Sequence, residues 1–247
     1  MVENIYIRVW GGIGNQLFIY AFARCISLNW DGKVGLETHS GFRGDGYHRI
    51  YKLDCFSITL PKSNFLSSLF FSFNRKYPLL KRLFFPSSRL IIENEDQLNS
   101  NVSEFIPPPY LKERTLFYQG YWQHINFLSI REILLSELRF NLAPNSVFEE
   151  IKAKIQASEA VCLHVRRMQY SRLLTLDYYR AAVSILEKSC TAPCFFIFSD
   201  DLAWCRERLS ISYPCVYIDN FDDELYELQL MSFCHHFIIA NSSFSWW

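Results

Sequence analysis

Short apolar strands alternate with helical patterns throughout the second half of the chain, and this alternation constrains the fold more than any other feature. Apolar runs of strand length recur at residues 161–165, 194–198, 215–218 and 237–240. In the intervals, apolar residues recur every three or four positions, which predicts helices around residues 179–186, 202–209 and 225–231. Parallel strands joined by helices need right-handed crossovers, so this half predicts a parallel sheet covered by helices.

The first half opens with the same kind of unit. Residues 5–10 form an apolar strand, a glycine-rich segment at residues 11–14 interrupts it, and a helical pattern runs from Leu17 to Leu28. Residues 33–37 have the composition of a second short strand. A strand, a glycine loop, a helix and another strand are the start of a parallel α/β unit.

A domain boundary is expected near Ala143-Pro144, where a helical pattern around residues 130–138 has ended. Directly afterwards, Ser146 and Glu149 have the spacing of a capping box, which predicts the start of a new helix. The chain is therefore predicted to be an α/β protein with two Rossmann-like domains built on parallel sheets. Their expected bounds are residues 1–144 and 145–247.

Composition narrows the classes of function. The 247 residues carry 25 basic and 25 acidic side chains, so the basic excess typical of nucleic-acid-binding proteins is missing and no nucleic-acid partner is expected. The sequence has no run of 18 mostly apolar residues, and its first residues do not resemble a signal peptide. The eight cysteines show no Cys-x-x-Cys spacing, which indicates free thiols in a reducing, cytoplasmic setting.

Polar or glycine-rich segments follow four of the expected strands. In open parallel sheets, ligands bind beyond the carboxyl ends of the strands, so these segments hold the candidate site. Arg166 and Arg167 follow the strand at 161–165, and His164 lies in its end. The candidates in the other three segments are Gly12, Gly14 and Asn15, then Ser199 and Asp200, and finally Asn241, Ser242, Ser243 and Ser245.

This set of groups suits a diphosphate, and hence a nucleotide. Guanidinium groups match phosphate oxygens with two hydrogen bonds, and helix N-termini offer free N–H groups to an anion. Taken singly, each segment has a plainer interpretation: the arginines as a surface ion pair, and the serine-containing loops as helix caps. The joint placement of all four segments at strand ends favours the nucleotide site.

No metal is expected. The sequence lacks an Asp-x-Asp pattern, and Glu93-Asn94-Glu95 is the nearest analogue. His235 and His236 are adjacent, so on a helix they would point in different directions.

Five motifs resemble those of the alpha-1,2-fucosyltransferase family, glycosyltransferase family 11, almost from end to end. The longest is the amino-terminal segment Gly11-Gly12-Ile13-Gly14-Asn15-Gln16-Leu17-Phe18-Ile19-Tyr20-Ala21. The other four are Gly120-Tyr121-Trp122-Gln123, His164-Val165-Arg166-Arg167, Phe198-Ser199-Asp200-Asp201 and Asn241-Ser242-Ser243-Phe244-Ser245-Trp246-Trp247.

The resemblance implies an inverting, metal-independent enzyme of the GT-B type, with two facing Rossmann-like domains. It implies GDP-fucose as donor, bound by residues 145–247. Residues 1–144 would take the acceptor, a galactose-containing oligosaccharide or lipid-linked glycan that receives fucose on its 2-hydroxyl. Arg166 or Arg167, with Ser242 and Ser243, would stabilise the leaving diphosphate, and Asn15 would face the donor. Glu37 and Asp45 are the candidate bases.

Two departures from the family pattern leave alternatives open. Met168-Gln169 stands where the family has Gly-Asp, which suggests an altered donor or a sugar-nucleotide-binding protein without catalysis. The family also continues past the final Trp-Trp, so we expect either that the chain is truncated at Trp247 or that this member ends differently. A third alternative, an NAD(P)-dependent oxidoreductase, rests on Gly12-x-Gly14 with Glu37 further on, but the third glycine of that fingerprint is missing.

Residues 62–89 combine six basic side chains with phenylalanines, and no acidic residue occurs between Cys55 and Ile92. One interpretation is a solvated helical face over core aromatics. The other is a peripheral membrane contact, which would place the protein at the inner face of the membrane.

Overall fold

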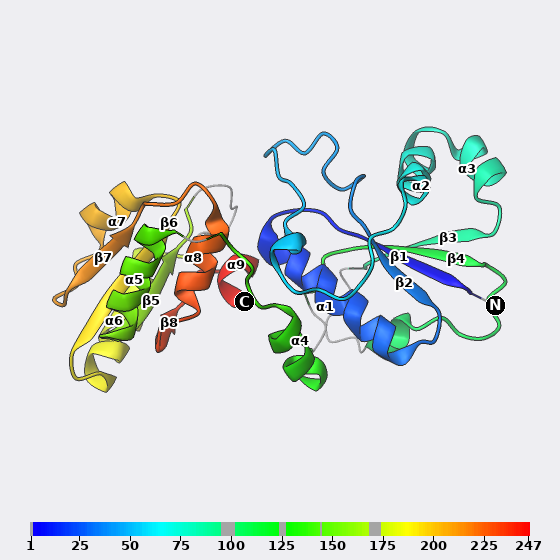
Figure 1. Ribbon diagram of the computed structural model, residues 1–247. Helices are drawn as coiled ribbons and strands as arrows, with labels where there is room; N and C mark the ends of the chain where they lie inside the picture. Colours follow the sequence, from blue (N-terminus) through cyan, green and yellow to red (C-terminus); the bar gives the residue numbers. More distant parts are fainter. Residues whose placement is uncertain (1, 95–101, 124–126, 144, 168–173) are drawn as a thin grey trace. The chain divides into compact units, whose positions relative to one another are not determined.

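The computed structural model describes residues 2–94, 102–123, 127–143, 145–167 and 174–247. The chain forms two compact units, Met1–Asn141 and Leu142–Trp247, each with a sheet and covering helices (Figure 1). The boundary predicted after residue 144 falls close to this division. No helix among the described residues is both long and apolar enough to cross a bilayer.

The first unit is built on a four-stranded parallel sheet with the strand order β2-β1-β4-β3. Its strands are β1 (Asn4–Arg8), β2 (Lys33–Glu37), β3 (Ser88–Ile92) and β4 (Thr115–Gln119). Its α-helices are α1 (Ile13–Asn29), α2 (Phe65–Lys76), α3 (Pro78–Phe84) and α4 (Arg131–Glu137). Short 3₁₀ turns lie at Leu53–Cys55, Val102–Phe105 and Leu128–Ile130.

Alternation along the strands gives the first sheet two apolar faces. On one face, Tyr6 of β1 lies beside Phe117 of β4, and Phe70 of α2 stacks on Phe117 with ring centroids 3.7 Å apart. On the other face, Phe22 of α1 contacts Tyr118 of β4 with ring centroids 5.8 Å apart. Helices α1 and α2 therefore cover opposite faces of this sheet.

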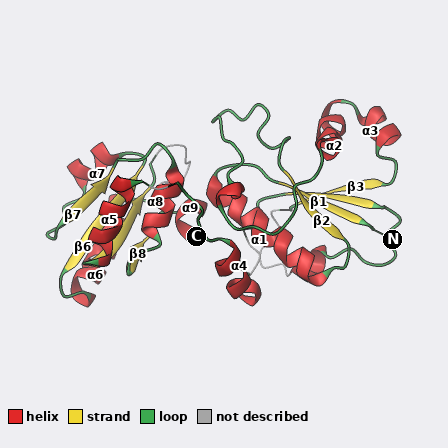
Figure 2. Cartoon of the chain, viewed as in Figure 1, coloured by secondary structure: helices red, strands yellow, loops and turns green. Residues whose placement is uncertain are grey.

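The second unit carries another parallel sheet, with the order β7-β6-β5-β8. Its strands are β5 (Glu159–Val165), β6 (Pro193–Ser199), β7 (Cys215–Ile218) and β8 (His236–Ile238). Its helices are α5 (Ser146–Gln156), α6 (Leu176–Ser189), α7 (Leu202–Arg208), α8 (Glu224–Met231) and α9 (Ser243–Trp246), and Figure 2 shows them packed along the strands. The strand–helix alternation predicted for this half is confirmed.

Two apolar layers sandwich the second sheet. Cys162 of β5 and Phe196 of β6 pack with α5 and α8, whereas Val161 and Leu163 of β5 pack with Tyr179 of α6 and with α7. All eight cysteines of the chain are free thiols. Five of them are buried, where a thiol serves as a small apolar side chain.

The predicted capping box is wrong by one residue. Asn145, not Ser146, caps α5, and its side-chain Oδ1 accepts a hydrogen bond from the Phe148 N–H at 3.0 Å. Ser146 is the first helical residue. Asparagine caps a helix as well as serine does, so the two neighbouring residues were equivalent candidates.

Candidate functional site

The topology of the second unit brings three of the predicted segments to one sheet edge. The chain leaves β5 towards β6 on one side, whereas β8 pairs with β5 on the other side. The carboxyl ends of β5 and β8 therefore form a switch point, where open α/β sheets bind ligands. We call residues 164–167, 199–201 and 239–245 the second-unit edge.

Two aspartates hold the two arginines at this edge. Arg166 Nε lies 3.2 Å from Asp200 Oδ2, and the backbone N–H of Arg167 donates to Asp200 Oδ1 at 2.8 Å. Arg167 Nε lies 3.9 Å from Asp201 Oδ2. The arginine side chains remain 31% and 27% exposed, so an anion can reach them.

The two arginines lie in different surroundings, because successive side chains of an extended segment point to opposite sides. Arg166 interacts electrostatically with His164 and with Glu227 of α8. The guanidinium carbon of Arg167 instead lies 4.2 Å from the ring centroid of Trp204 on α7. Arg166 therefore shares the side of α8, and Arg167 the side of α7.

His164 is buried and neutral. Burial and, to a smaller extent, the nearby positive charge of Arg166 together lower its pKa to about 3. Its Nδ1 atom finds no hydrogen-bond partner among the described residues, and its ring lies 5.5 Å from the ring of Phe244 in α9. An imidazole kept uncharged leaves Arg166 as the positive group on this side of the strand.

The serine-rich segment after β8 divides into two kinds of residue. Ser242 caps α9 by accepting a hydrogen bond from the Phe244 N–H at 3.2 Å, and buried Ser245 donates to the Ala240 carbonyl at 3.1 Å. Asn241 is exposed and Ser243 is half-buried. The hydroxyls of Ser242 and Ser245 are thus engaged in shaping the turn, whereas Asn241 and Ser243 face outward.

The loop after β6 is shaped by its own side chains. Ser199 Oγ accepts from the Asp201 N–H at 2.9 Å, and Asp201 caps α7 by accepting from the Trp204 N–H at 3.0 Å. The helix cap at this loop is therefore Asp201. The Asp200 carboxylate instead contacts the Arg166 side chain and the backbone N–H of Arg167.

In the first unit, the glycine loop after β1 begins with a residue that only glycine suits. Gly11 has a φ of +82°, and a Cβ there would lie 3.0 Å from Asn15 Nδ2 and 3.2 Å from Tyr121 Cε1. Gly12 precedes α1 with open space around it. Gly14 is buried within the first turn. Gly12 is partly exposed, whereas Gly11 and Ile13 on either side of it are buried.

The carboxyl ends of β1 and β4 meet, which the sequence analysis did not foresee because neither β3 nor β4 was predicted. Trp10 stacks on Tyr121, with ring centroids 4.3 Å apart, and its Nε1 donates to the Gly120 carbonyl at 3.2 Å. Asn15 Oδ1 accepts from Gln123 Nε2 at 2.8 Å. The glycine loop and the Gly-Tyr-Trp-Gln motif thus form one surface, which we call the first-unit edge.

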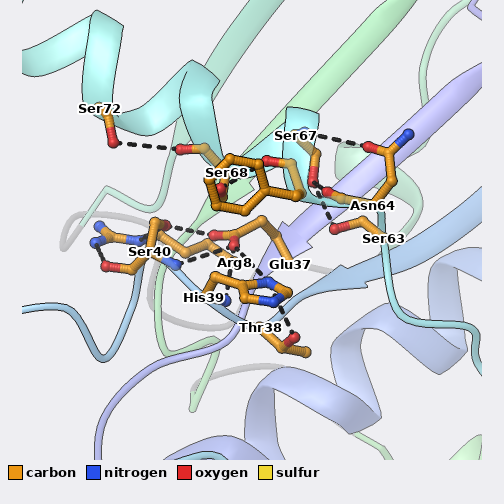
Figure 3. Close-up of polar contacts among 11 residues, drawn as sticks. Arg8, Glu37, Thr38, His39, Ser40, Ser63, Asn64, Ser67, Ser68 and Ser72 are labelled. Atoms are coloured by element: carbon orange, nitrogen blue, oxygen red, sulfur yellow. Dashed lines mark hydrogen bonds and ion pairs between the residues drawn. The ribbon is translucent and has the colours of Figure 1, made fainter.

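Glu37 lies at the end of β2 and is fully buried (Figure 3). Its carboxylate accepts hydrogen bonds from the His39 N–H at 2.8 Å, from the Ser40 N–H at 3.0 Å and from the Ser40 hydroxyl. Arg8 fixes the same loop by donating from Nε to Ser40 Oγ at 2.9 Å. Glu37 therefore shapes the loop after β2, whatever further role it has.

Asp45, the other predicted base, lies in a more open loop. Its Oδ2 accepts from the Arg49 N–H at 2.9 Å and from the Tyr47 N–H at 3.1 Å, and the Asp45 side chain is 16% exposed. Asp45 also interacts electrostatically with Tyr121, whose pKa is raised mainly by burial. The loop thus reaches the first-unit edge.

Glu227 is a site candidate that sequence reasoning missed. Its pKa is raised to about 7, mainly by burial and further by the negative charge of Glu224, against the opposing effect of Arg166. Within the helical pattern of α8 nothing distinguishes Glu227 from a solvated surface residue, so no sequence signal marked it. Perturbed carboxyl groups beside a candidate anion site are typical of functional centres.

A group of possible metal ligands lies at the opposite end of the second sheet. Glu159, Cys190 and His236 offer ligand atoms within 4.8 Å of one another. However, Glu159 Oε2 already accepts from the N–H groups of Thr191 and Ala192, at 2.9 and 2.8 Å, so the group has a structural explanation. Glu93 belongs to the Glu93-Asn94-Glu95 pattern that most resembled a metal-binding motif in the sequence. Its carboxylate accepts hydrogen bonds from the N–H groups of Tyr121 and Trp122.

The sequence departure at Met168-Gln169 lies outside the described residues. So does Glu95 of the acidic analogue.

A comparison with protein families shows which family this chain belongs to. Residues 4–247 match the model of glycosyl transferase family 11. The chain belongs to this family. The membership indicated by the five motifs is confirmed, and it rules against the oxidoreductase alternative.

Two curated relatives from Escherichia coli extend over nearly the whole chain. The alpha-1,2-colitosyltransferase is 28% identical over 265 residues, covering 98% of this chain and 86% of that protein. The O-antigen biosynthesis glycosyltransferase WbnK is 26% identical over 283 residues, covering 98% and 88%. The chain is thus similar to two glycosyltransferases. The name of one refers to colitose, and the name of the other refers to the O-antigen.

Solved structures share the fold. The fucosyltransferase NodZ from Bradyrhizobium matches with a TM-score of 0.57 and 13% identity, over 99% of this chain and 92% of that chain. A variant of Arabidopsis thaliana FUT1 in complex with GDP matches with a TM-score of 0.54 and 10% identity, over 99% and 67%. The predicted GT-B-type α/β fold with parallel sheets is confirmed.

The buried His164 predicts a specific loss of stability in acid. In the unfolded chain a histidine binds a proton below a pH of about 6.5, whereas folded His164 does so only near its pKa of about 3. The free energy of unfolding therefore falls as the pH drops from about 6.5 towards 3, by about 2 kcal/mol at pH 5. Urea denaturation of wild type and His164→Gln at both pH 7 and pH 5 measures the difference.

The matched control is His39→Gln, which changes an exposed histidine of the first unit. It should keep the wild-type dependence on pH. An identical pH dependence for wild type and His164→Gln would show that His164 is not held neutral.

Proposed function

We propose that this family 11 glycosyltransferase transfers fucose from GDP-fucose to the 2-hydroxyl of a galactose-type acceptor, with inversion and without a metal ion. The observation that carries the proposal is the pair of partly exposed arginines at the switch point of the second unit, held by Asp200 and Asp201. A guanidinium pair supplies the positive charge that a metal would otherwise bring to a diphosphate. A solved NodZ structure obtained by soaking with GDP-fucose supports the same class of donor.

The reaction places negative charge on the diphosphate. The acceptor oxygen forms a bond to the anomeric carbon, the bond from that carbon to the diphosphate oxygen breaks, and the acceptor proton passes to a base. The transition state is oxocarbenium-like, as in glycoside hydrolysis. A cation placed at the leaving diphosphate therefore stabilises the transition state more than the bound donor.

Arg166 is the better candidate for the diphosphate. It lies on the α8 side of β5, with His164 beside it and Phe244 of the serine-rich turn against His164. Asp200 orients its side chain through Nε. Arg167 lies over the Trp204 ring, where it helps to hold the loop.

For the base we favour Asp45 over Glu37. Glu37 is fully buried, and its carboxylate accepts three hydrogen bonds from its own loop. Asp45 is partly exposed and lies near Tyr121 and the glycine loop. A base must reach the proton it accepts, and of these two candidates only Asp45 has a carboxylate that solvent can reach.

The transferred sugar has one specific alternative, because one relative is named a colitosyltransferase. A non-catalytic sugar-nucleotide-binding protein is the other alternative, and it rests on Met168-Gln169. A turnover assay with the guanosine diphosphate esters of fucose and colitose, in EDTA, distinguishes the three. Transfer of fucose to the acceptor, without hydrolysis of the donor, supports the proposal. Preferential transfer of colitose supports a colitosyltransferase. Absence of transfer from either donor supports a non-catalytic sugar-nucleotide-binding protein.

Replacing Arg166 tests the diphosphate role. We expect Arg166→Ala to lower kcat/KM by about 10²–10³, as the loss of one transition-state hydrogen-bond donor does elsewhere. Initial rates of GDP release with acceptor present measure this. The matched control is Arg180→Ala, an exposed arginine on α6 whose nearest carboxylate, that of Asp177, is 3.9 Å away. If Arg166→Ala and Arg167→Ala both keep full turnover, the proposed role of this edge is wrong.

Replacing Asp45 tests the base. Asp45→Asn keeps the size and hydrogen-bonding oxygen but cannot accept the proton, so kcat should fall by about 10²–10⁴ while KM for the donor stays near its wild-type value. Asp54→Asn is the control, since Asp54 is exposed and pairs with Lys62. An unchanged kcat in Asp45→Asn would exclude Asp45 as the base and would leave Glu37 as the other candidate.

A further inference from the structure

An apolar and cationic surface covers α3 and the residues that flank it. We call it the α3 surface. Its members share exposure or partial exposure on the short helix or immediately beside it. They are Lys76, Tyr77, Leu79, Leu80, Lys81, Arg82, Leu83 and Phe84.

Helix α3 buries none of its residues, although more than half of them are apolar. Leu79 is 82% exposed and Leu83 is 71% exposed. The neighbouring α2 behaves differently, because Phe70 and Phe71 pack on Phe117 of the sheet. Helix α2 thus attaches this segment to the first unit, and α3 follows it along the chain (Figure 1). Helix α3 presents an apolar face that the described residues leave uncovered.

The apolar residues of α3 form a single stripe. At about 100° per residue, Leu79, Leu80, Leu83 and Phe84 fall within an arc of about 140°. Lys81 and Arg82 lie about 60° beyond the two edges of that arc by the same geometry. A stripe of leucine and phenylalanine bordered on both sides by cations is the pattern of a helix that lies in a lipid interface.

The sequence segment that carries this stripe has charges of one sign only. The chain as a whole is neutral, yet no acidic residue occurs between Cys55 and Ile92. Lys76 and Arg82 form no ion pair with any residue that the structure describes. Lys62, by contrast, pairs with Asp54 and does not belong to the surface.

We propose that the α3 surface binds the surface of an anionic lipid bilayer. The apolar stripe enters the headgroup region, and the long basic side chains keep their charges at the level of the lipid phosphates. A second copy of the chain is a poorer occupant, because a two-fold interface would place the same cations of both copies against one another. The proposal concerns a surface away from the sheet edges and does not rest on the identity of the sugar donor.

Vesicle co-sedimentation of the full chain tests the charge component. Binding should be strong with vesicles of phosphatidylcholine and phosphatidylglycerol, weak with phosphatidylcholine alone, and reduced by added salt. Each cation contributes about fivefold to partitioning, so Lys76→Gln/Arg82→Gln should bind about 25-fold less. The control Lys152→Gln/Lys154→Gln removes two cations that pair with neighbouring carboxylates, and should bind as wild type.

A second pair of variants tests the apolar component. Leu79→Ser/Leu83→Ser should lower partitioning roughly tenfold or more, whereas Leu135→Ser/Ile185→Ser changes two other exposed residues and should not. Thermal unfolding checks that each variant is folded. Equal binding to neutral and anionic vesicles, or wild-type binding by both test variants, would overturn the proposal. So would loss of a dimer in Leu79→Ser/Leu83→Ser, by sedimentation velocity, without loss of vesicle binding.

Discussion

The parallel pairing of β5 with two neighbours is the constraint on which the second unit depends. All but the first residue of β5 are buried, so the strand accepts apolar layers on both faces. Because β6 and β8 lie on opposite sides of it, the segments after β5 and β8 end side by side at a switch point. The alternation of the strand continues into the next two residues and sends Arg166 and Arg167 to different sides. One buried strand thereby determines where both guanidinium groups are placed.

The charges at this edge leave two guanidinium groups accessible to an anion. Asp200 and Asp201 orient the arginines without enclosing them, since both arginine side chains stay about a third exposed. His164 is kept neutral by burial, and Glu227 titrates near neutrality for the same physical reason. Burial therefore adjusts two titratable groups on the same side of β5 as Arg166. In the first unit, Gly11 has a positive φ, which lets the chain pass close to Tyr121.

The sequence predicted much of the second unit and less of the first, for identifiable reasons. Strands 161–165 and 194–198 are long apolar runs separated by clear helical spacing, and both are present. Strand β4 is only five residues long and follows a segment with three consecutive prolines, so no periodicity marked it. Strand order depends on tertiary pairing, which is why the meeting of Trp10 with Tyr121 was not foreseen. The motifs were enough to identify the candidate residues. Their surroundings, such as Glu227 beside Arg166, could be identified only from the folded structure.

We propose that the second-unit edge binds a guanosine diphosphate through Arg166 without a metal. Calorimetric titration of the full chain with GDP, alongside UDP and in EDTA, tests this binding. We expect saturable binding of GDP, weak or no binding of UDP, and strongly reduced GDP affinity in Arg166→Ala but not in Arg180→Ala. Equal affinity for GDP and UDP, or GDP binding that Arg166→Ala leaves unchanged, would contradict it.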